Sequence, residues 1–229
     1  MGLRRNLRRW YSDFKKVYVE KDKVRIGQIR WKKDRGEETL RYELPISECR
    51  TVFDIGGYMG GYTAEIRKRY DSECYLFEPV PHFYDECSRR FDRDDKVHCY
   101  PFGLSGKDEI LKISLLEDAS STLLASGGEK TQDVEIRGVV DFLAASNVDH
   151  IDLMKINIEG GEFGLLEALT QSEWIHKVNV LQIQFHDFVD NADAMRDSLR
   201  AALASTHKEL WNYDFVWECW MRKSQKLPG

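Results

Sequence analysis

The chain has 229 residues, of which 42% are hydrophobic and 32% are charged, and this composition suits one soluble α/β domain better than two full domains. A net charge of -5 argues against general binding to nucleic acid, and there is no apolar run of the roughly 20 residues that a membrane span needs. Five dispersed cysteines without a C-x-x-C pair, and no apolar leader, predict reduced thiols in a cytoplasmic protein.

The first 20 residues predict a basic amphipathic helix, because apolar side chains recur at helical spacing among arginines and lysines. This apolar stripe consists of Leu3, Leu7, Trp10, Phe14 and Val17. It is too large to remain in water, so we expect it to dock on its own domain, on a second copy of the chain, or on an anionic surface. Docked on its own domain, it would wall the acceptor half of the active crevice.

Residues 24–31 and 39–44 predict two strands around a polar turn. Together with the preceding helix, this hairpin would form an N-terminal element over residues 1–50, serving as a lid or an oligomer contact. The main domain is expected to cover residues 51–229.

Residues 51–63, T-V-F-D-I-G-G-Y-M-G-G-Y-T, predict a strand, a glycine-rich turn and the start of a helix. In α/β proteins such a turn lets the backbone approach a nucleotide-like cofactor, because glycine has no side chain to block it. The next predicted strand, 74–78, ends in Glu78, about two dozen positions after Asp54, where a carboxylate can hold ribose hydroxyls.

The spacing of these glycines does not name the cofactor. Their order is G-G-x-x-G-G, whereas dinucleotide-binding turns usually show G-x-G-x-x-G. The alternatives are a dinucleotide site and a tight strand-to-helix turn that binds no ligand.

Alternating strands and helices from residue 51 onward predict a doubly wound, mostly parallel sheet. The predicted strands are 51–56, 74–78, 97–102, 151–158 and 178–185, and the predicted helices are about 61–70, 81–91, 162–170 and 191–206. Residues 109–115 and 134–137 interrupt this rhythm and predict antiparallel strands. The aromatic stretch 209–221 predicts closing antiparallel strands at the C-terminal end.

Residues 151–162, I-D-L-M-K-I-N-I-E-G-G-E, predict a central strand with polar residues near its carboxyl end. Lys155, Asn157 and Glu159 alternate, so they would share one face of the strand, which favours a binding or catalytic site. The alternative is a buried lysine–glutamate pair with a purely structural role.

His186 follows the predicted strand 178–185 directly, at the same kind of position. A histidine there is able to take a proton from a hydroxyl near neutral pH. A structural histidine bonded to a neighbouring loop explains the sequence equally well.

Four ordered blocks resemble the FkbM family of S-adenosylmethionine-dependent methyltransferases. They are D-I-G-G-Y-M-G-G-Y-T, L-F-E-P-V-P, D-L-M-K-I-N-I-E-G-G-E and L-Q-I-Q-F-H, and they span roughly residues 50–190. The resemblance implies a Rossmann-like class I methyltransferase fold, S-adenosyl-L-methionine as cofactor, and methylation of a hydroxyl oxygen. Family substrates include sugars of glycans and hydroxyls of secondary metabolites.

The resemblance also implies roles for individual residues. The catalytic candidates are His186 and Glu159 as bases and Lys155 as the cation that steadies a developing alkoxide. The expected cofactor-binding residues are Asp54, Gly56, Gly57, Tyr58, Gly60, Thr63, Glu78, Phe102, Gly103, Leu104 and Asn157.

The chain departs from the family pattern at three positions. Tyr58 replaces a usual asparagine and would put a bulky ring near the methionine end of the cofactor. Two departures bear on metal binding: Asn157 stands where the family usually has an acid, and Gln184 replaces a usual glutamate. Because Mg²⁺ prefers carboxylates, we expect no metal site.

The predicted function is an S-adenosylmethionine-dependent O-methyltransferase of a sugar or glycan hydroxyl. The alternatives are methylation of a small secondary metabolite, a dinucleotide-binding oxidoreductase, and a noncatalytic adaptor that uses the cofactor fold. We expect neither a nucleic-acid partner nor a transmembrane segment, and a homo-oligomer through the N-terminal segment is possible.

Overall fold

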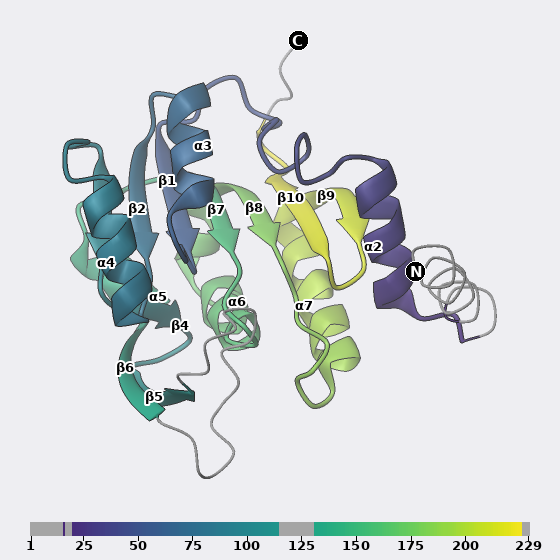
Figure 1. Ribbon diagram of the computed structural model, residues 1–229. Helices are drawn as coiled ribbons and strands as arrows, with labels where there is room; N and C mark the ends of the chain where they lie inside the picture. The colour runs from purple at the N-terminus through teal and green to yellow at the C-terminus, as the bar shows by residue number, and fades with distance from the viewer. Residues whose placement is uncertain (1–15, 17–19, 115–130, 226–229) are drawn as a thin grey trace, which may run out of the picture.

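The computed structural model describes residue 16 and residues 20–114 and 131–225, which form an α/β fold around a seven-stranded sheet (Figure 1). The strand order is β3-β2-β1-β7-β8-β10-β9, in which the first five strands are parallel and β10 and β9 are antiparallel to their neighbours. This confirms the predicted doubly wound sheet with antiparallel strands at its C-terminal end. The helix expected at residues 1–20 falls almost entirely outside the described residues.

Each strand of the main sheet forms where apolar and β-branched residues cluster. The strands are β1 (Thr51–Ile55), β2 (Glu73–Phe77), β3 (Val97–Tyr100), β7 (Ile151–Ile156), β8 (Val178–Ile183), β9 (His207–Tyr213) and β10 (Trp217–Arg222). All of β8 and nearly all of β7 are buried, as expected for central strands covered on both faces. In Figure 1 the arrowheads of β1, β7 and β8 point to one common edge of the sheet.

Two layers of helices cover the sheet (Figure 1). Helices α3 (Gly61–Arg69) and α4 (Pro81–Arg90) lie on one face, and α5 (Val139–Ala145), α6 (Glu162–Thr170) and α7 (Ala192–Thr206) lie on the other. A short 3₁₀ helix, η2 (Glu173–Lys177), leads into β8. Apart from α5 and η2, which the sequence did not predict, these helices agree with prediction to within a few residues. No helix in the described part of the chain is long and apolar enough to cross a membrane.

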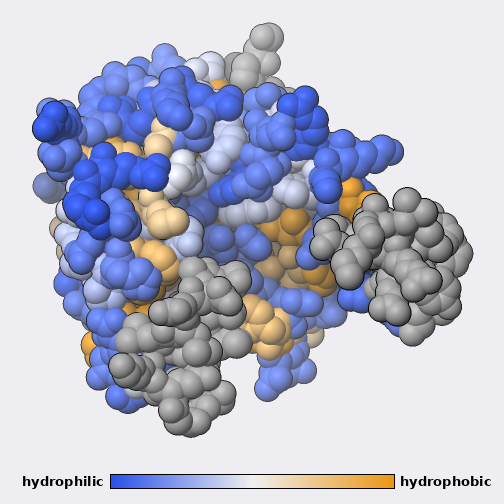
Figure 2. Space-filling model, viewed as in Figure 1, coloured by the Kyte–Doolittle hydropathy of each residue, from blue (hydrophilic) through white to orange (hydrophobic). Residues whose placement is uncertain are grey.

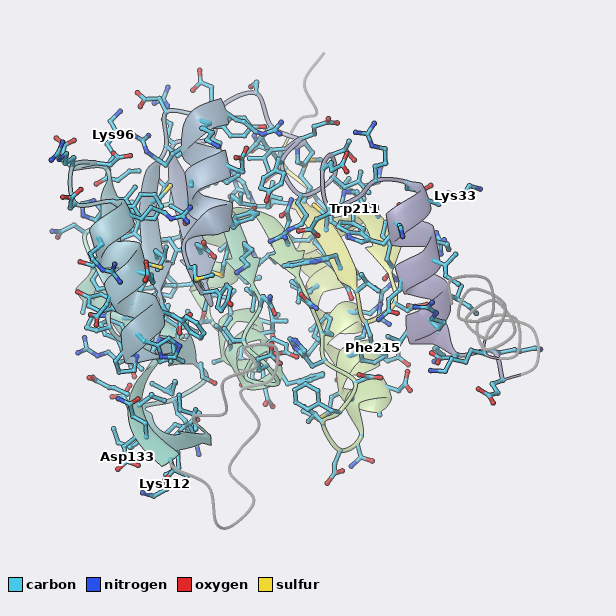
Figure 3. All side chains as sticks on the ribbon, viewed as in Figure 1. Lys33, Lys96, Lys112, Asp133, Trp211 and Phe215 are labelled. Carbon is cyan, nitrogen blue, oxygen red and sulfur yellow. The ribbon has the colours of Figure 1, made fainter. Side chains whose placement is uncertain are left out.

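A small second sheet lies beside the main one and contains β4 (Gly103–Ser105), β6 (Thr131–Gly138) and β5 (Glu109–Ser114) in that order. β5 and β6 are antiparallel, as predicted, while β4 and β6 are parallel. The ion pair between Lys112 Nζ and Asp133 Oδ1, 2.9 Å apart, joins β5 and β6 at the outer end of this sheet (Figure 3). The single strand predicted at residues 97–102 is shorter in the structure, because the chain leaves the main sheet after Tyr100 and continues as β4 of the small sheet.

The prediction of a hairpin at residues 24–31 and 39–44 is wrong. The chain instead forms helix α2 (Lys23–Lys33), whose first turn is capped by the side chain of Asp22, and then a series of turns. Trp31 packs edge-on against Tyr213, with ring centroids 5.1 Å apart, and its ring centroid lies 5.7 Å from that of Trp211 on β9, which Figure 3 labels. Only Gly27 and Trp31 of α2 are buried, and Trp31 packs against β9, whereas Ile29 is exposed.

The main core lies between the sheet and helices α5, α6 and α7, and includes Phe53, Phe77, Met154, Leu165 and Leu181. A second cluster, around Val52, Ile66 and Leu153, fills the opposite face under α3. The outer surface in the view of Figure 2 is mostly hydrophilic, with apolar areas between. Both clusters hold the sheet rigid, so its carboxyl-end edge is a fixed platform for the side chains described next.

Candidate functional site

The glycine turn connects β1 to α3, as the sequence predicts. Gly56 has a φ of 82°, and the amides of Gly56 and Gly57 both donate to the carbonyl of Phe77 on β2, at 3.0 and 3.1 Å. Gly60, with a φ of 73°, precedes the first residue of α3. The turn is thus tied to the neighbouring strand, and the N-terminal end of α3 lies at the carboxyl-end edge of the sheet, where helix N–H groups favour anionic or polar ligands.

We expect the substitution Gly56→Ala to destabilise the protein by about 2 kcal/mol or more. A Cβ on Gly56 would lie 1.9 Å from the carbonyl oxygen of Asn157, and its φ is strained for any residue with a side chain. Thermal unfolding monitored by circular dichroism measures the loss.

Gly61→Ala is the matched control, because a Cβ there meets nothing within 4 Å among the described residues. Alanine also favours a helix over glycine by up to about 1 kcal/mol. Equal melting temperatures for the two variants would show that the backbone around Asn157 can move enough to admit a side chain at position 56.

Three buried polar side chains behind the turn bond to one another. Asp54 Oδ2 accepts from Thr63 Oγ1 at 2.7 Å, and Asp54 Oδ1 pairs with Lys155 Nζ at 2.9 Å. Lys155 Nζ also donates to the carbonyl oxygens of Gly56 at 2.6 Å and of Ile55 at 3.5 Å. Burial lowers the pKa of Lys155, while Asp54 opposes that shift. These contacts favour a role in fixing the turn for all three side chains, since the donors of Lys155 point into the protein.

Glu78 lies just past β2 and is 5% exposed. Its Oε2 accepts from the amide of Tyr58 at 2.8 Å and its Oε1 from the amide of Val80 at 2.9 Å. Each carboxylate oxygen has two lone pairs, so each keeps one for a ligand hydroxyl. Burial raises the pKa of Glu78 to about 7, and the two backbone amides oppose that shift. The geometry fits a carboxylate that binds the paired hydroxyls of a ribose.

Asn157 follows the last residue of β7, and its amide donates to the carbonyl of Ile55 at 3.0 Å. Its side-chain Oδ1 is buried and accepts no hydrogen bond from the described residues. Such an unpaired acceptor is costly unless a ligand donor satisfies it. An acceptor here and a carboxylate at Glu78 together fit a nucleoside cofactor that also carries an amino group.

The remaining predicted cofactor residues have different surroundings. Tyr58 has a φ of 51°, is 42% exposed, and packs on Phe83 with ring centroids 4.4 Å apart. Phe102 and Leu104 are buried in the main core, and Gly103 is buried beside Pro79. Because the side chains of Phe102 and Leu104 lie in the core, only the backbone of residues 102–104 would be available to border an adenine ring.

His186 lies three residues after β8 and forms a cluster with two glutamates. Its Nδ1 is 3.1 Å from Glu162 Oε1, and its Nε2 is 3.6 Å from Glu159 Oε2. Burial opposes the charged ring, but the bond and charge of Glu162 and the charge of Glu159 outweigh it and raise the pKa of His186. Burial also raises the pKa of Glu159. A histidine between two carboxylates, with raised pKa values on His186 and Glu159, makes this cluster a candidate acid–base centre.

The sequence places Lys155, Asn157 and Glu159 on one strand face, but β7 ends at Ile156. Glu159 instead belongs to a turn and has a φ of 49°, an uncommon conformation for a residue with a side chain. The turn directs its carboxylate toward His186. Of the three, Lys155 lies behind the glycine turn, while Asn157 and Glu159 follow the strand.

Two surface hollows are lined by other residues. One, of about 450 Å³, is lined by Tyr75, Tyr100 and Phe142, and the other, of about 390 Å³, by Ser105, Gly164 and Glu167, among others. Neither lining includes Glu78 or His186. The candidate site is therefore defined by the convergence of its side chains, and we place no ligand in either hollow.

The glycine turn, Glu78 and the strand-end turn of β7 all lie within a recognised domain. The family described as the methyltransferase FkbM domain matches residues 54–214, which is most of the chain. The chain belongs to the FkbM methyltransferase family. The match covers the described site from Asp54 through His186.

Two curated relatives of this FkbM chain are fungal proteins. Methyltransferase 1 of Beauveria bassiana (strain ARSEF 2860) is 24% identical over 157 residues, covering 57% of this chain and 62% of the relative. Methyltransferase sdnD of Sordaria araneosa is 23% identical over 159 residues, covering 54% and 61%. The chain thus spans about three fifths of the length of these curated relatives.

Among solved structures, a putative rRNA methylase from Clostridium thermocellum has a TM-score of 0.49 at 10% identity, over 79% of this chain and 90% of that one. An rRNA methylase from Streptococcus thermophilus has a TM-score of 0.47 at 12% identity, over 78% and 89%.

Glu162 is a residue of this FkbM domain that the sequence analysis did not single out. It is the first residue of α6, is fully buried, and contacts His186. The K-I-x-x-E-G-x-E block contains it, so the signal was present, but its link to His186 depends on how β7 and β8 lie side by side. Within the described residues, no group of three or more histidines, cysteines and acids could hold a metal ion.

Proposed function

We propose that this FkbM domain is an S-adenosylmethionine-dependent O-methyltransferase that acts on a hydroxyl of a sugar or glycan. The observation that carries the proposal is the His186–Glu159–Glu162 cluster, which lies at the same sheet edge as the glycine turn and Glu78. Because β2, β1, β7 and β8 are parallel neighbours, their carboxyl ends meet at that edge.

The cofactor half of the site consists of the turn after β1, Glu78 and Asn157. Glu78 would accept hydrogen bonds from the ribose hydroxyls, and the unpaired Oδ1 of Asn157 would accept a hydrogen bond from the amino group. When bound, S-adenosylmethionine supplies an electrophilic methyl group on its sulfonium. Lys155 and Thr63 hold Asp54 and thereby fix the backbone that the cofactor contacts.

The acid–base half of the site receives the acceptor. A sugar hydroxyl is a weak nucleophile and loses its proton as the oxygen attacks, so a base within hydrogen-bond reach speeds the reaction. His186 Nε2 lies 3.6 Å from Glu159, the more exposed of the two glutamates, and would take that proton. Much of the rate would come from holding the hydroxyl in line with the methyl group.

We propose a sugar as the acceptor because a sugar hydroxyl is a weak nucleophile and needs a base such as His186 to remove its proton. Phe188, 51% exposed and 5.3 Å from the ring of His186, offers a flat apolar surface beside it. A small secondary metabolite with a hydroxyl group remains the second candidate, since the same ring would contact it equally well.

The test is incubation of the chain with S-adenosylmethionine and a panel of sugars, glycosides and hydroxylated small metabolites. Mass spectrometry should find a product heavier by one CH₂ group, methylated on oxygen. Transfer to nitrogen or carbon acceptors alone would contradict the proposal. Tight cofactor binding without transfer to any acceptor would favour a noncatalytic adaptor.

A further inference from the structure

Glu162 is the most completely bonded carboxylate beside the candidate base. Its Oε1 accepts from the amide of His186 at 2.8 Å and lies 3.1 Å from His186 Nδ1. Its Oε2 accepts from the amide of Gly160 at 2.8 Å. The side chain is fully buried at the first turn of α6, where the helix dipole and these amides stabilise its negative charge. It therefore joins the turn after β7 to the end of β8.

A carboxylate accepts hydrogen bonds and donates none, so its contact with His186 Nδ1 requires a proton on that nitrogen. In the neutral ring the lone pair is then on Nε2. Nε2 is the nitrogen that faces Glu159, at 3.6 Å, on the more exposed side of the cluster. A ring without this restraint would be free to place its proton on either nitrogen.

We propose that Glu162 is the positioning residue of this site: it holds His186 in the Nδ1-protonated tautomer, so that Nε2 is the nitrogen that accepts the acceptor's proton. The role of Nε2 rests on the proposed function, but the tautomer needs neither cofactor nor acceptor. In the step itself, the hydroxyl proton passes to Nε2, the oxygen bonds to the methyl carbon, and the carbon–sulfur electron pair stays on sulfur. His186 then releases its proton to solvent.

The test is nitrogen NMR of the full chain labelled with ¹⁵N-histidine, with His186 assigned by the loss of its signals in His186→Gln. In the wild type, Nδ1 of the neutral ring should carry the proton. In Glu162→Gln the pKa of His186 should fall by about one unit or more, because a nearby opposite charge is lost, and the Nδ1 preference should weaken.

Asp187→Asn is the matched control, since Asp187 also raises the pKa of His186 by its charge but makes no bond to the ring. It should lower the pKa slightly and leave the tautomer unchanged. A wild-type ring with its proton on Nε2 would overturn the proposal even if Glu162→Gln failed to fold. The same spectrum in Glu162→Gln and Asp187→Asn would also overturn it.

The kinetic readout separates this proposal from the proposed function. Glu162→Gln should lower kcat while leaving the affinity for S-adenosylhomocysteine nearly unchanged, and Asp187→Asn should change neither. Methyl transfer with the opposite tautomer would refute the positioning role alone. The expected tautomer without methyl transfer would refute the function alone.

Discussion

His186→Gln should lower the rate of methyl transfer by roughly 10²–10⁴-fold, the usual contribution of a general base. Cofactor affinity should remain nearly intact, because the residues proposed to bind the cofactor, Glu78 and the glycine turn, lie elsewhere on the same edge. In the wild type the rate should rise with pH as His186 loses its proton. That rise should lie above the ordinary histidine pKa of about 6.5, because Glu162 and Glu159 outweigh burial and raise the pKa of His186.

The measurement is the pH dependence of kcat with the acceptor that the panel identifies. His176→Gln is the control, since His176 is an exposed histidine on η2 outside the cluster. If His186→Gln retains the wild-type rate, or keeps the rising limb of the pH profile, His186 is structural and Glu159 becomes the leading base.

Glu78→Gln should weaken binding of S-adenosylhomocysteine by about 1.5–3 kcal/mol, the scale of hydrogen bonds to a charged acceptor. In the wild type, affinity should also depend on pH. The raised pKa of Glu78, about 7, means that the carboxyl takes up a proton as pH falls through 7 and then loses acceptor sites. Below pH 7 the affinity should fall by up to about tenfold per pH unit until it reaches the level of Glu78→Gln, and Glu78→Gln should abolish that dependence.

The raised pKa of Glu78 affects the stability of the ligand-free protein in the opposite direction to its effect on cofactor affinity. Because burial raises the pKa of Glu78, its contribution to stability is present at low pH and is lost as pH rises through 7.

Glu73→Gln is the matched control for the binding experiment at the other end of β2, where the side chain is exposed and pairs with His98. Calorimetry that finds equal, pH-independent affinity in wild type and Glu78→Gln would remove Glu78 from the ribose site.

The sheet and the glycine turn were predictable because their signals are local. The apolar runs before Asp54 and Glu78, and the glycines between, determine a strand, a turn and a helix with little help from distant residues. The parallel order then follows from the alternation of strands and helices. These local features are enough to place Glu78 at the correct edge of the sheet.

The prediction for residues 24–31 was wrong because their structure depends on a distant contact and not on a local signal. Their short pattern of apolar residues fits a strand or a helix, and the packing of Trp31 on β9 decides between them. The partner strand lies nearly 180 residues later in the chain, so no local signal identifies it. Tertiary contact overrode the local preference.

The cluster of His186, Glu159 and Glu162 was only partly predictable. His186 was identified because it follows a strand, but Glu162 contacts it only because β7 and β8 pair in parallel. For Lys155 the sequence suggested a free cation near the acceptor, whereas its ammonium bonds to Asp54 and Gly56. Neither the direction of a strand-end side chain nor its bonding partners can be deduced from alternation alone.

The most direct test of the central claim is calorimetry of the unmodified chain at pH 8, where Glu78 is ionised, with S-adenosylhomocysteine, NAD and NADP titrated separately. S-adenosylhomocysteine should bind at one site per chain, and neither dinucleotide should bind. Binding of NAD or NADP instead of S-adenosylhomocysteine would show that the crevice is a dinucleotide site.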